Sequence, residues 1–202
     1  MEKQIILASA SSRRISLLKK WGLSFKTQPS KIKENTNLKR PHSIVKDLSY
    51  KKCKAVSDKN PNSIVLSADT LVVLGKIILG KPKDKKESEK MIRMLNGSFH
   101  KVYTGVSIID NTCGRESVFY DCALIKARKL PESSLIKLFG KHIDKAGGYA
   151  VQNKNDNFIE KIYGDYYTVV GLPYKKLKAE LKNFKIRIQD KTLLRKVEKT
   201  SL

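Results

Sequence analysis

The chain has 202 residues, of which 42 are Lys or Arg and 19 are Asp or Glu, so its formal net charge is +23 at pH 7. Apolar residues make up 40% of the chain, which is enough for one packed domain and too many for an intrinsically disordered protein. No apolar run approaches the ~20 residues that a transmembrane helix needs, and the N-terminus does not resemble a secretory signal. A cytoplasmic location is therefore expected.

The first third of the chain alternates between strand and helix patterns. Short apolar runs predict buried strands, and apolar residues spaced three or four apart predict helices. Pro41 suits the first turn of a helix, and Gly22 suits the end of one. We expect, in order, a strand at 4–8, a helix at 11–21, a short strand at 25–28, a polar loop at 31–40 and a helix at 41–57.

The rest of the chain adds hairpins to this alternation. Gly75 and Lys76 predict a tight turn after a long extended run, and Asp84 with Glu87 has the spacing of a helix capping box. We expect strands at 63–74 and 77–79, a helix ending at Asn96, strands at 101–109 and 117–126, a helix at 131–139, a strand at 158–162 and a helix at 172–181.

These patterns together indicate an α/β fold with a mixed sheet, because parallel crossovers and antiparallel hairpins both occur. Residues 1–182 are expected to form a single domain. Residues 183–202 are basic and poorly patterned, and we expect them to form a C-terminal tail.

The excess positive charge allows two interpretations. Lysines dominate it and occur in nearly every segment, which favours dispersed, solvated charge. The alternative is a face that binds polyanions, because a field of this size attracts nucleotides and nucleic acids. Against that alternative, the basic residues lack the aromatic interleaving of single-strand binders along the sequence.

Residues 5–14, IILASASSRR, turn directly from an apolar strand into small residues and two arginines. One interpretation is an anion site between strand and helix, with Ser9 near the backbone turn and Arg13 and Arg14 supplying charge. The other is a serine-capped helix with two exposed arginines.

Four more residues are candidates for ligand contact. Asp69 follows a buried strand, a position at which α/β proteins bind ligands, although it also suits a turn or cap. Lys81 precedes Pro82 in a rigid GKP turn, and Glu34 lies in the polar loop. Gln152, in GGYAVQN, has an amide that can both donate to and accept from a base edge. Each could equally be an ordinary loop residue.

Several common chemistries are excluded. The sequence has no Walker A loop, dinucleotide fingerprint, HExxH motif or GxSxG elbow. Its three histidines are not clustered. Its cysteines, Cys53, Cys113 and Cys122, lack zinc-ligand spacing and are expected to be reduced thiols.

Six segments in order resemble one family, the Maf proteins, which are nucleoside triphosphate pyrophosphatases. They are LASASSRR, SADT, LGKP, LNGSFHKVYTGV, DKAGGYAVQN and FIEKIYGDYYTVVGLP. The resemblance implies a Maf/ITPase-like fold, an elongated bent mixed sheet with two lobes flanked by helices and a central cleft. It also implies hydrolysis of a nucleoside triphosphate to the monophosphate and pyrophosphate with a divalent metal, Mg²⁺ or Mn²⁺, and a homodimer.

The resemblance assigns roles to individual positions. Asp69 falls on the catalytic acid, the proton acceptor, and Arg13, Thr70 and Gln152 fall on positions associated with substrate choice. That trio is similar to the subfamily acting on dTTP and UTP, with modified pyrimidine nucleotides as further candidates. The chain departs from the family pattern at three places. Ser12 stands in place of proline, LNG replaces the usual LSG, and VQN replaces IQG, which puts Asn153 in place of glycine.

From these assignments we expect a phosphate site made by Ser9, Arg13, Arg14, Lys52 and Lys81. Asp69 and Glu34 together would hold the metal, because they are acids in an otherwise basic set. Two alternatives stay open. One is a pyrophosphatase acting on 7-methyl-GTP or another modified nucleotide, and the other is a non-catalytic nucleic-acid-binding or septum-regulating protein.

Overall fold

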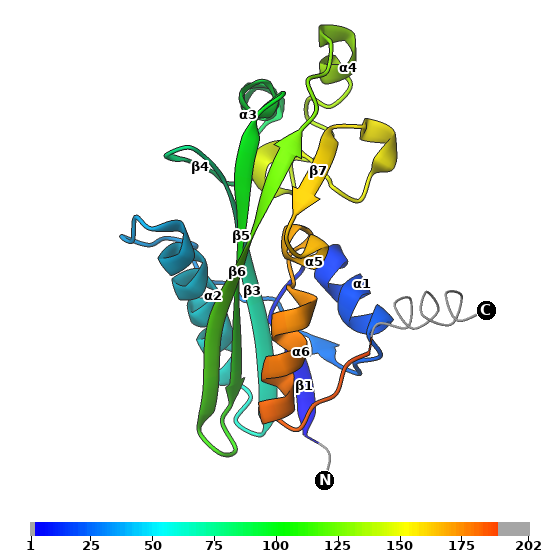
Figure 1. The fold of residues 1–202 in the computed structure, drawn as a ribbon. Coiled ribbons are helices and arrows are strands. Elements are labelled where there is room, and N and C mark those ends of the chain that lie inside the picture. The colour runs from blue at the N-terminus through cyan, green and yellow to red at the C-terminus, as the bar shows by residue number, and fades with distance from the viewer. Residues whose placement is uncertain (1–2, 190–202) are drawn as a thin grey trace, which may run out of the picture.

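The computed structural model describes residues 3–189 and is built on one seven-stranded mixed sheet (Figure 1). β1 runs parallel to both of its neighbours, and every other pair is antiparallel. The strand order is β2-β1-β3-β5-β6-β7, with β4 paired to β3. The strands are β1 (Gln4–Leu7), β2 (Lys26–Thr27), β3 (Ser63–Leu74), β4 (Ile77–Leu79), β5 (Phe99–Asp110), β6 (Arg115–Ala127) and β7 (Ile159–Tyr163).

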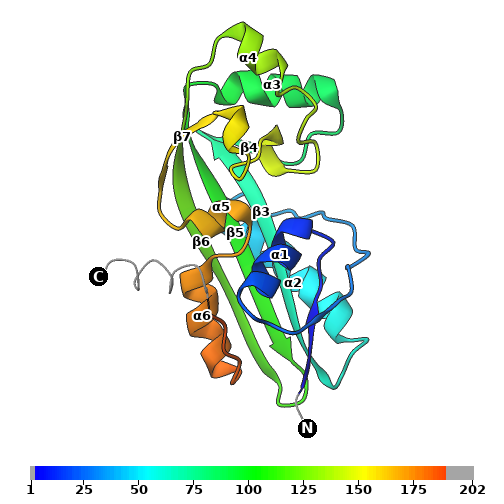
Figure 2. The same cartoon turned by 90° about the vertical axis from the view of Figure 1, so that its right-hand side faces the viewer.

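Helices cover both faces of the sheet. One side of its lower half carries α2, and the other side carries α1, α5 and α6 (Figure 1). At the far end of the long strands, α3 and α4 lie together (Figure 2). The helices are α1 (Ser12–Lys20), α2 (Pro41–Ser57), α3 (Lys85–Leu95), α4 (Glu132–Ile136), α5 (Tyr166–Val170) and α6 (Tyr174–Asn183).

Two large hydrophobic cores lie along the sheet, and we call them the lower and upper cores. The lower core packs α1 and α6 on β3 and β5, with Trp21, Leu66 and Leu177 at its centre. The upper core packs α3 on the other end of the same strands, around Ile92 and Val102. Because β3 and β5 run through both cores, they join two lobes in one sheet. The expected α/β class with a mixed sheet is confirmed.

The helix α2 lies unusually close to β5. A Cβ atom added to Gly105 would be 2.2 Å from the backbone oxygen of Val45, so only glycine fits there. The hydroxyls of Ser49 and Ser107 lie 2.9 Å apart in the same interface. This tight packing fixes the height of α2 over the sheet, and with it the position of Lys52 one turn further along.

Some element boundaries differ from the sequence expectations. The helix expected at 131–139 is shorter, Glu132–Ile136, and α5 was not predicted. Phe184 and Ile188 are buried in the lower core, so the packed domain extends past residue 182, where the tail was expected to begin. Residues 190–202 of the expected tail lie outside the described residues. Among residues 3–189, no helix has the length and apolar character needed to cross a membrane.

Candidate active site

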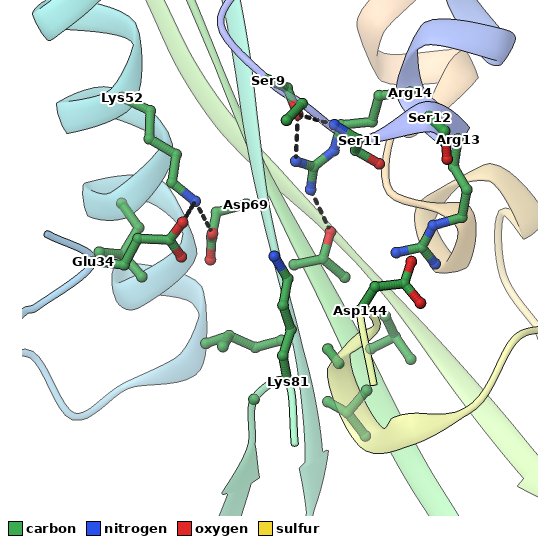
Figure 3. A pocket seen from close by; sticks show the side chains of 18 of the residues that line it. Ser9, Ser11, Ser12, Arg13, Arg14, Glu34, Lys52, Asp69, Lys81 and Asp144 are labelled. Atoms are coloured by element: carbon green, nitrogen blue, oxygen red, sulfur yellow. Dashed lines mark hydrogen bonds and ion pairs between the residues drawn. The ribbon is translucent and has the colours of Figure 1, made fainter. Parts of the chain in front are cut away.

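A cavity of about 520 Å³ opens beside the middle of β3 (Figure 3). This edge of β3 pairs with β1 as far as Leu66 and with β4 from Val72 onward. Between those points this edge pairs with no strand of the described sheet, and the residues from Asp69 to Val72 line the cavity. Successive side chains of a strand point to opposite faces, and both Asp69 and Thr70 therefore reach the cavity from this free edge.

The strand-to-helix turn of residues 8–14 forms one wall of the cavity. Ser9 Oγ accepts hydrogen bonds from the backbone N–H of Ser11 (3.2 Å) and from Arg14 Nη1 (3.3 Å). No side chain caps α1, and the backbone N–H of Ile15 makes the first bond of the helix, to Ser11. The amides of Ser12, Arg13 and Arg14 precede this first helical bond, at a place where a helix can bind an anion.

All three guanidinium nitrogens of Arg14 donate hydrogen bonds within the protein. Its Nε donates to the Gly171 carbonyl (3.1 Å), and its Nη2 donates to Thr70 Oγ1 (3.0 Å). Burial lowers the pKa of Arg14 to about 10, with Asp69 opposing the shift, and the side chain stays charged at neutral pH. Arg14 thus presents a fixed positive charge at the junction of α1, β3 and the segment after α5.

The hydroxyl of Thr70 makes two hydrogen bonds within the protein. Thr104 Oγ1 donates to the Thr168 carbonyl (2.7 Å), so across their 3.0 Å contact Thr70 is the donor and Thr104 the acceptor. Thr70 also accepts the bond from Arg14. In this arrangement Thr70 orients Arg14 and has no hydrogen left for a ligand.

Arg13 points into the cavity toward Asp144, which lies on a loop of the upper lobe (Figure 3). Burial lowers the pKa of Arg13, and the charges of Asp144 and Tyr149 oppose that shift. Asp144 also pairs with Lys145 (2.6 Å). The Arg13 guanidinium, unlike that of Arg14, is therefore free to meet a ligand between the two lobes.

Asp69, Lys52 and Glu34 form a charged triad on the opposite wall. Lys52 Nζ lies 2.6 Å from Asp69 Oδ1 and 2.9 Å from Glu34 Oε1. The side chains of Asp69 and Lys52 are only 8% and 10% exposed, whereas that of Glu34 is 51% exposed. Burial raises the pKa of Glu34, but the hydrogen bond and charge of Lys52, with Lys81 and Arg14, outweigh it and leave that pKa below its usual value.

The two carboxylates meet at one point, and this bears on metal binding. Among residues 3–189, no group of three or more His, Cys, Asp or Glu side chains could hold a metal ion by itself. Mg²⁺, however, is usually bound by one or two carboxylates together with substrate phosphates and water. Asp69 and Glu34 already place one cation, the Lys52 ammonium, between them, so their chemistry fits such a shared site.

The cavity brings together most of the site residues predicted from the sequence. Lys81 lies on the loop after β4, and its side chain extends into the cavity (Figure 3). Gln152 is exposed and lies outside the lining. The predicted residues that line the cavity are Ser9, Arg13, Arg14, Glu34, Lys52, Asp69, Thr70 and Lys81.

Sequence reasoning missed several polar lining residues, among them Asp144 and Tyr149. Both lie in the segment DKAGGYAVQN, from which only Gln152 was selected. Tyr149 Oη lies 2.8 Å from Nε2 of the buried His100, which anchors this segment to β5. An acid and an aromatic hydroxyl next to two glycines were a usable signal, because small neighbours let both approach a ligand.

Residues 4–184 match the family described as Maf-like protein. A dTTP/UTP pyrophosphatase of Elusimicrobium minutum is 42% identical over 181 residues, covering 90% of this chain and 98% of that one. A dTTP/UTP pyrophosphatase of Bacillus cereus is 40% identical over 189 residues and covers 92% of each chain.

A solved structure, the Ham1 protein of Staphylococcus aureus, resembles the fold. Its TM-score is 0.53 at 12% sequence identity, covering 90% of this chain and 99% of that one. At this identity the likeness concerns architecture alone, and it agrees with the two-lobed mixed sheet described above. The family match, which spans most of the chain, is decisive for membership, and this protein belongs to the Maf-like protein family.

Proposed function

We propose that this protein hydrolyses dTTP and UTP to the nucleoside monophosphate and pyrophosphate. The observation that carries the proposal is the placement of the Asp69 carboxylate in one cavity with the anion-binding turn of residues 8–14. The printed names of two relatives about 40% identical support the same reaction. A cytoplasmic location and a homodimer are proposed with it, on the family resemblance.

The triphosphate is proposed to lie across the cavity. The free amides at the start of α1 and the guanidinium of Arg13 suit phosphate oxygens, since arginine can bind two oxygens at once. Lys81 adds a flexible positive charge from the other lobe. These groups neutralise charge on the pyrophosphate as it leaves, which is the main task of a protein in this class of reaction.

Asp69 is proposed to accept the proton of the attacking water. The water oxygen bonds to the α-phosphorus, the bond from the α-phosphorus to the bridging oxygen breaks, and pyrophosphate takes the electron pair. Lys52 holds Asp69 in place through their 2.6 Å contact. A divalent metal held by Asp69 and Glu34 would, when bound, make that water more acidic and shield the phosphate charges.

Substrate choice is assigned to Arg13, Thr70 and Gln152. The hydrogen bonds of Thr70 indicate that it acts by orienting Arg14, not by touching the base. Gln152 has to come inward with its loop to reach a bound nucleotide, since it is exposed in the free protein. If Gln152→Ala leaves the preference among triphosphates unchanged, its role in selection is refuted.

The deciding experiment is a panel of triphosphates with Mg²⁺ or Mn²⁺, including dTTP, UTP, CTP, ATP, GTP and 7-methyl-GTP, with the products separated by chromatography. The expected result is that dTTP and UTP are both turned over faster than the other triphosphates. The two can differ by at most roughly 10–200-fold, because a pocket gains only about 1–3 kcal/mol from the thymine methyl. Pyrophosphate and a monophosphate are the expected products. Release of a diphosphate, or a clear preference for 7-methyl-GTP, would contradict the proposal.

Asp69→Asn tests the role of the carboxylate. Turnover is expected to fall by about 10²-fold or more with the fold intact, because the amide cannot accept the proton. Asp47→Asn is the matched control, since Asp47 lies on α2 and pairs with Lys51 away from the cavity lining. Near-normal turnover in Asp69→Asn removes this residue from the mechanism.

A further inference from the structure

One side of the sheet in the upper lobe is not covered by a helix of the described chain. Alternate residues of β5 point to the upper core, where His100 and Val102 are buried. The residues between them point the other way, and the register aligns Phe99 with Lys126 and Lys126 with Lys161. In the upper lobe this side of β5, β6 and β7 is exposed at Phe99, Lys101, Lys161 and Tyr163.

Large aromatic side chains stand on that surface. Phe99 is 53% exposed and Tyr163 is 45% exposed, and both lie on the side of the upper lobe that no described helix covers. Surfaces of this kind commonly mark a binding site.

A lysine ammonium lies over each of these rings in a cation–π contact. Lys126 Nζ lies 4.6 Å from the centroid of Phe99, and Lys161 Nζ lies 5.0 Å from that of Tyr163. Aromatic and basic groups thus alternate across strands, although they do not alternate along the sequence.

We propose that this surface binds single-stranded nucleic acid, with bases stacked on the rings and phosphates beside the lysines. That pairing of groups is what sequence-tolerant single-strand binders use. We call it the aromatic–lysine face, and it consists of Phe99, Lys126, Lys161 and Tyr163.

Charge decides between the possible occupants. A second copy of the chain seated on this face would bring lysines against lysines, in a protein whose net charge is already +23. A polyanion has the complementary sign and is attracted by the whole field. A duplex offers phosphates but keeps its bases stacked inside, so the exposed rings favour a single strand.

The four residues of this face are not among those that line the cavity, so binding here is independent of the proposed hydrolysis.

The test is fluorescence anisotropy of a labelled oligothymidylate and of a duplex of equal length, at several salt concentrations. The single strand is expected to bind more tightly than the duplex, with an affinity that falls steeply as salt rises. The double variant Phe99→Ala with Tyr163→Ala is expected to weaken single-strand binding by about tenfold or more. Its dTTP hydrolysis is expected to be unchanged, which shows that the fold is intact.

Two double lysine variants distinguish binding at a defined face from attraction by the dispersed charge of the whole protein. Lys126→Ala with Lys161→Ala is expected to weaken binding and reduce its salt dependence, whereas the matched control, Lys86→Ala with Lys90→Ala on α3, is expected to change both much less. Equal effects of the two pairs, or full binding after removal of the rings, would overturn the proposal. Sedimentation that shows a dimer dissociated by Tyr163→Ala would also overturn it, because the face would then join two copies of the chain.

Discussion

Lys52 is the residue on which both carboxylates of the cavity converge. It is nearly buried, and its ammonium holds the pKa of Glu34 low despite burial of that carboxyl. In Lys52→Met the two carboxylates would face each other without a cation between them. The pKa of Glu34 is then expected to rise, and the acidic limb of the pH–rate profile to move to higher pH.

A pH–rate profile of dTTP hydrolysis measures this shift. Lys51→Met is the matched control, because the neighbouring Lys51 pairs with Asp47 and does not line the cavity. It is expected to leave the profile in place. An unchanged acidic limb in Lys52→Met would show that Lys52 does not control the ionisation of the cavity.

His100 makes folding stability depend on pH. Burial lowers the pKa of His100 to about 4, from an ordinary value near 6.5. Between these values the unfolded chain binds the proton and the folded chain does not, so stability is complete above about pH 6.5 and falls as the pH falls toward 4. The loss at pH 5 is expected to be roughly 2 kcal/mol.

Urea denaturation at pH 7 and pH 5 measures that loss. His100→Gln is expected to reduce the difference between the two pH values, because glutamine does not titrate and can still bond to Tyr149. His42→Gln is the control, since His42 lies at the surface stacked on Tyr120 and its loss leaves the buried imidazole in place. The same pH dependence in His100→Gln as in the parent protein would refute the assignment.

For individual residues, the sequence was a good guide to which side chains line the cavity. It was a poor guide to their hydrogen-bond partners. Asp69 and Arg14 were selected from local motifs, and both line the cavity. The bond from Arg14 to the Gly171 carbonyl joins residues 157 positions apart, and no local pattern contains such a contact. The indirect role of Thr70 was likewise hidden, because it depends on Thr104 in another strand.

Among the elements, α2 and β5 form the most demanding contact. Gly105→Ala would place a Cβ atom against the backbone of Val45, which cannot move without shifting α2. The variant is expected to lose about 3 kcal/mol of stability or more, and to lower activity by displacing Lys52. Urea denaturation and dTTP turnover measure the two effects.

Gly80→Ala provides the comparison for that variant. A Cβ atom at Gly80 meets nothing within 4 Å, and its φ lies outside the left-handed region. Its stability is expected to change by less than about 1 kcal/mol. If Gly105→Ala were as stable as Gly80→Ala, the contact between α2 and β5 would not be as tight as described.

Elements with strong local signals were predicted well. The Asp84 side chain accepts from the Glu87 N–H at 2.7 Å, and the Glu87 carboxylate accepts from the Lys83 N–H, which confirms the capping interaction at the start of α3. The hairpin of β3 and β4 is confirmed as well. Helix α5 was missed because it spans only Tyr166–Val170, too short for a helical period to emerge.

For the whole molecule, the dominant property is its charge. A field of +23 attracts a triphosphate, which carries about four negative charges near neutral pH. Added salt screens this attraction over a Debye length of about 10 Å at 0.1 M. The KM for dTTP is therefore expected to rise several-fold between low and high salt while kcat changes little.

Initial rates at increasing potassium chloride and fixed free metal concentration test this expectation. The kcat serves as the internal control, because a salt effect on the chemical step or on folding would lower it. A KM that stays constant across the series would show that the net charge does not guide the substrate.

The global arrangement was only partly accessible from the sequence. Composition and alternation gave the α/β class with a mixed sheet, but no local pattern places β1 between β2 and β3. That order depends on pairing between distant segments, which the hydrophobic pattern does not specify. The common cavity follows from it, since ending β1 at Leu7 is what uncovers the middle of β3.

The uncovered edge of β3 has a consequence for how the enzyme would tolerate mutation. Peptide groups along a free strand edge can bond to a nucleotide whatever side chains stand beside them. An alanine scan of the cavity would therefore underestimate the contacts made there, because substitution leaves the peptide groups in place. Part of the selectivity would survive sequence drift among relatives, and only changes that close the gap between β1 and β4 would abolish it.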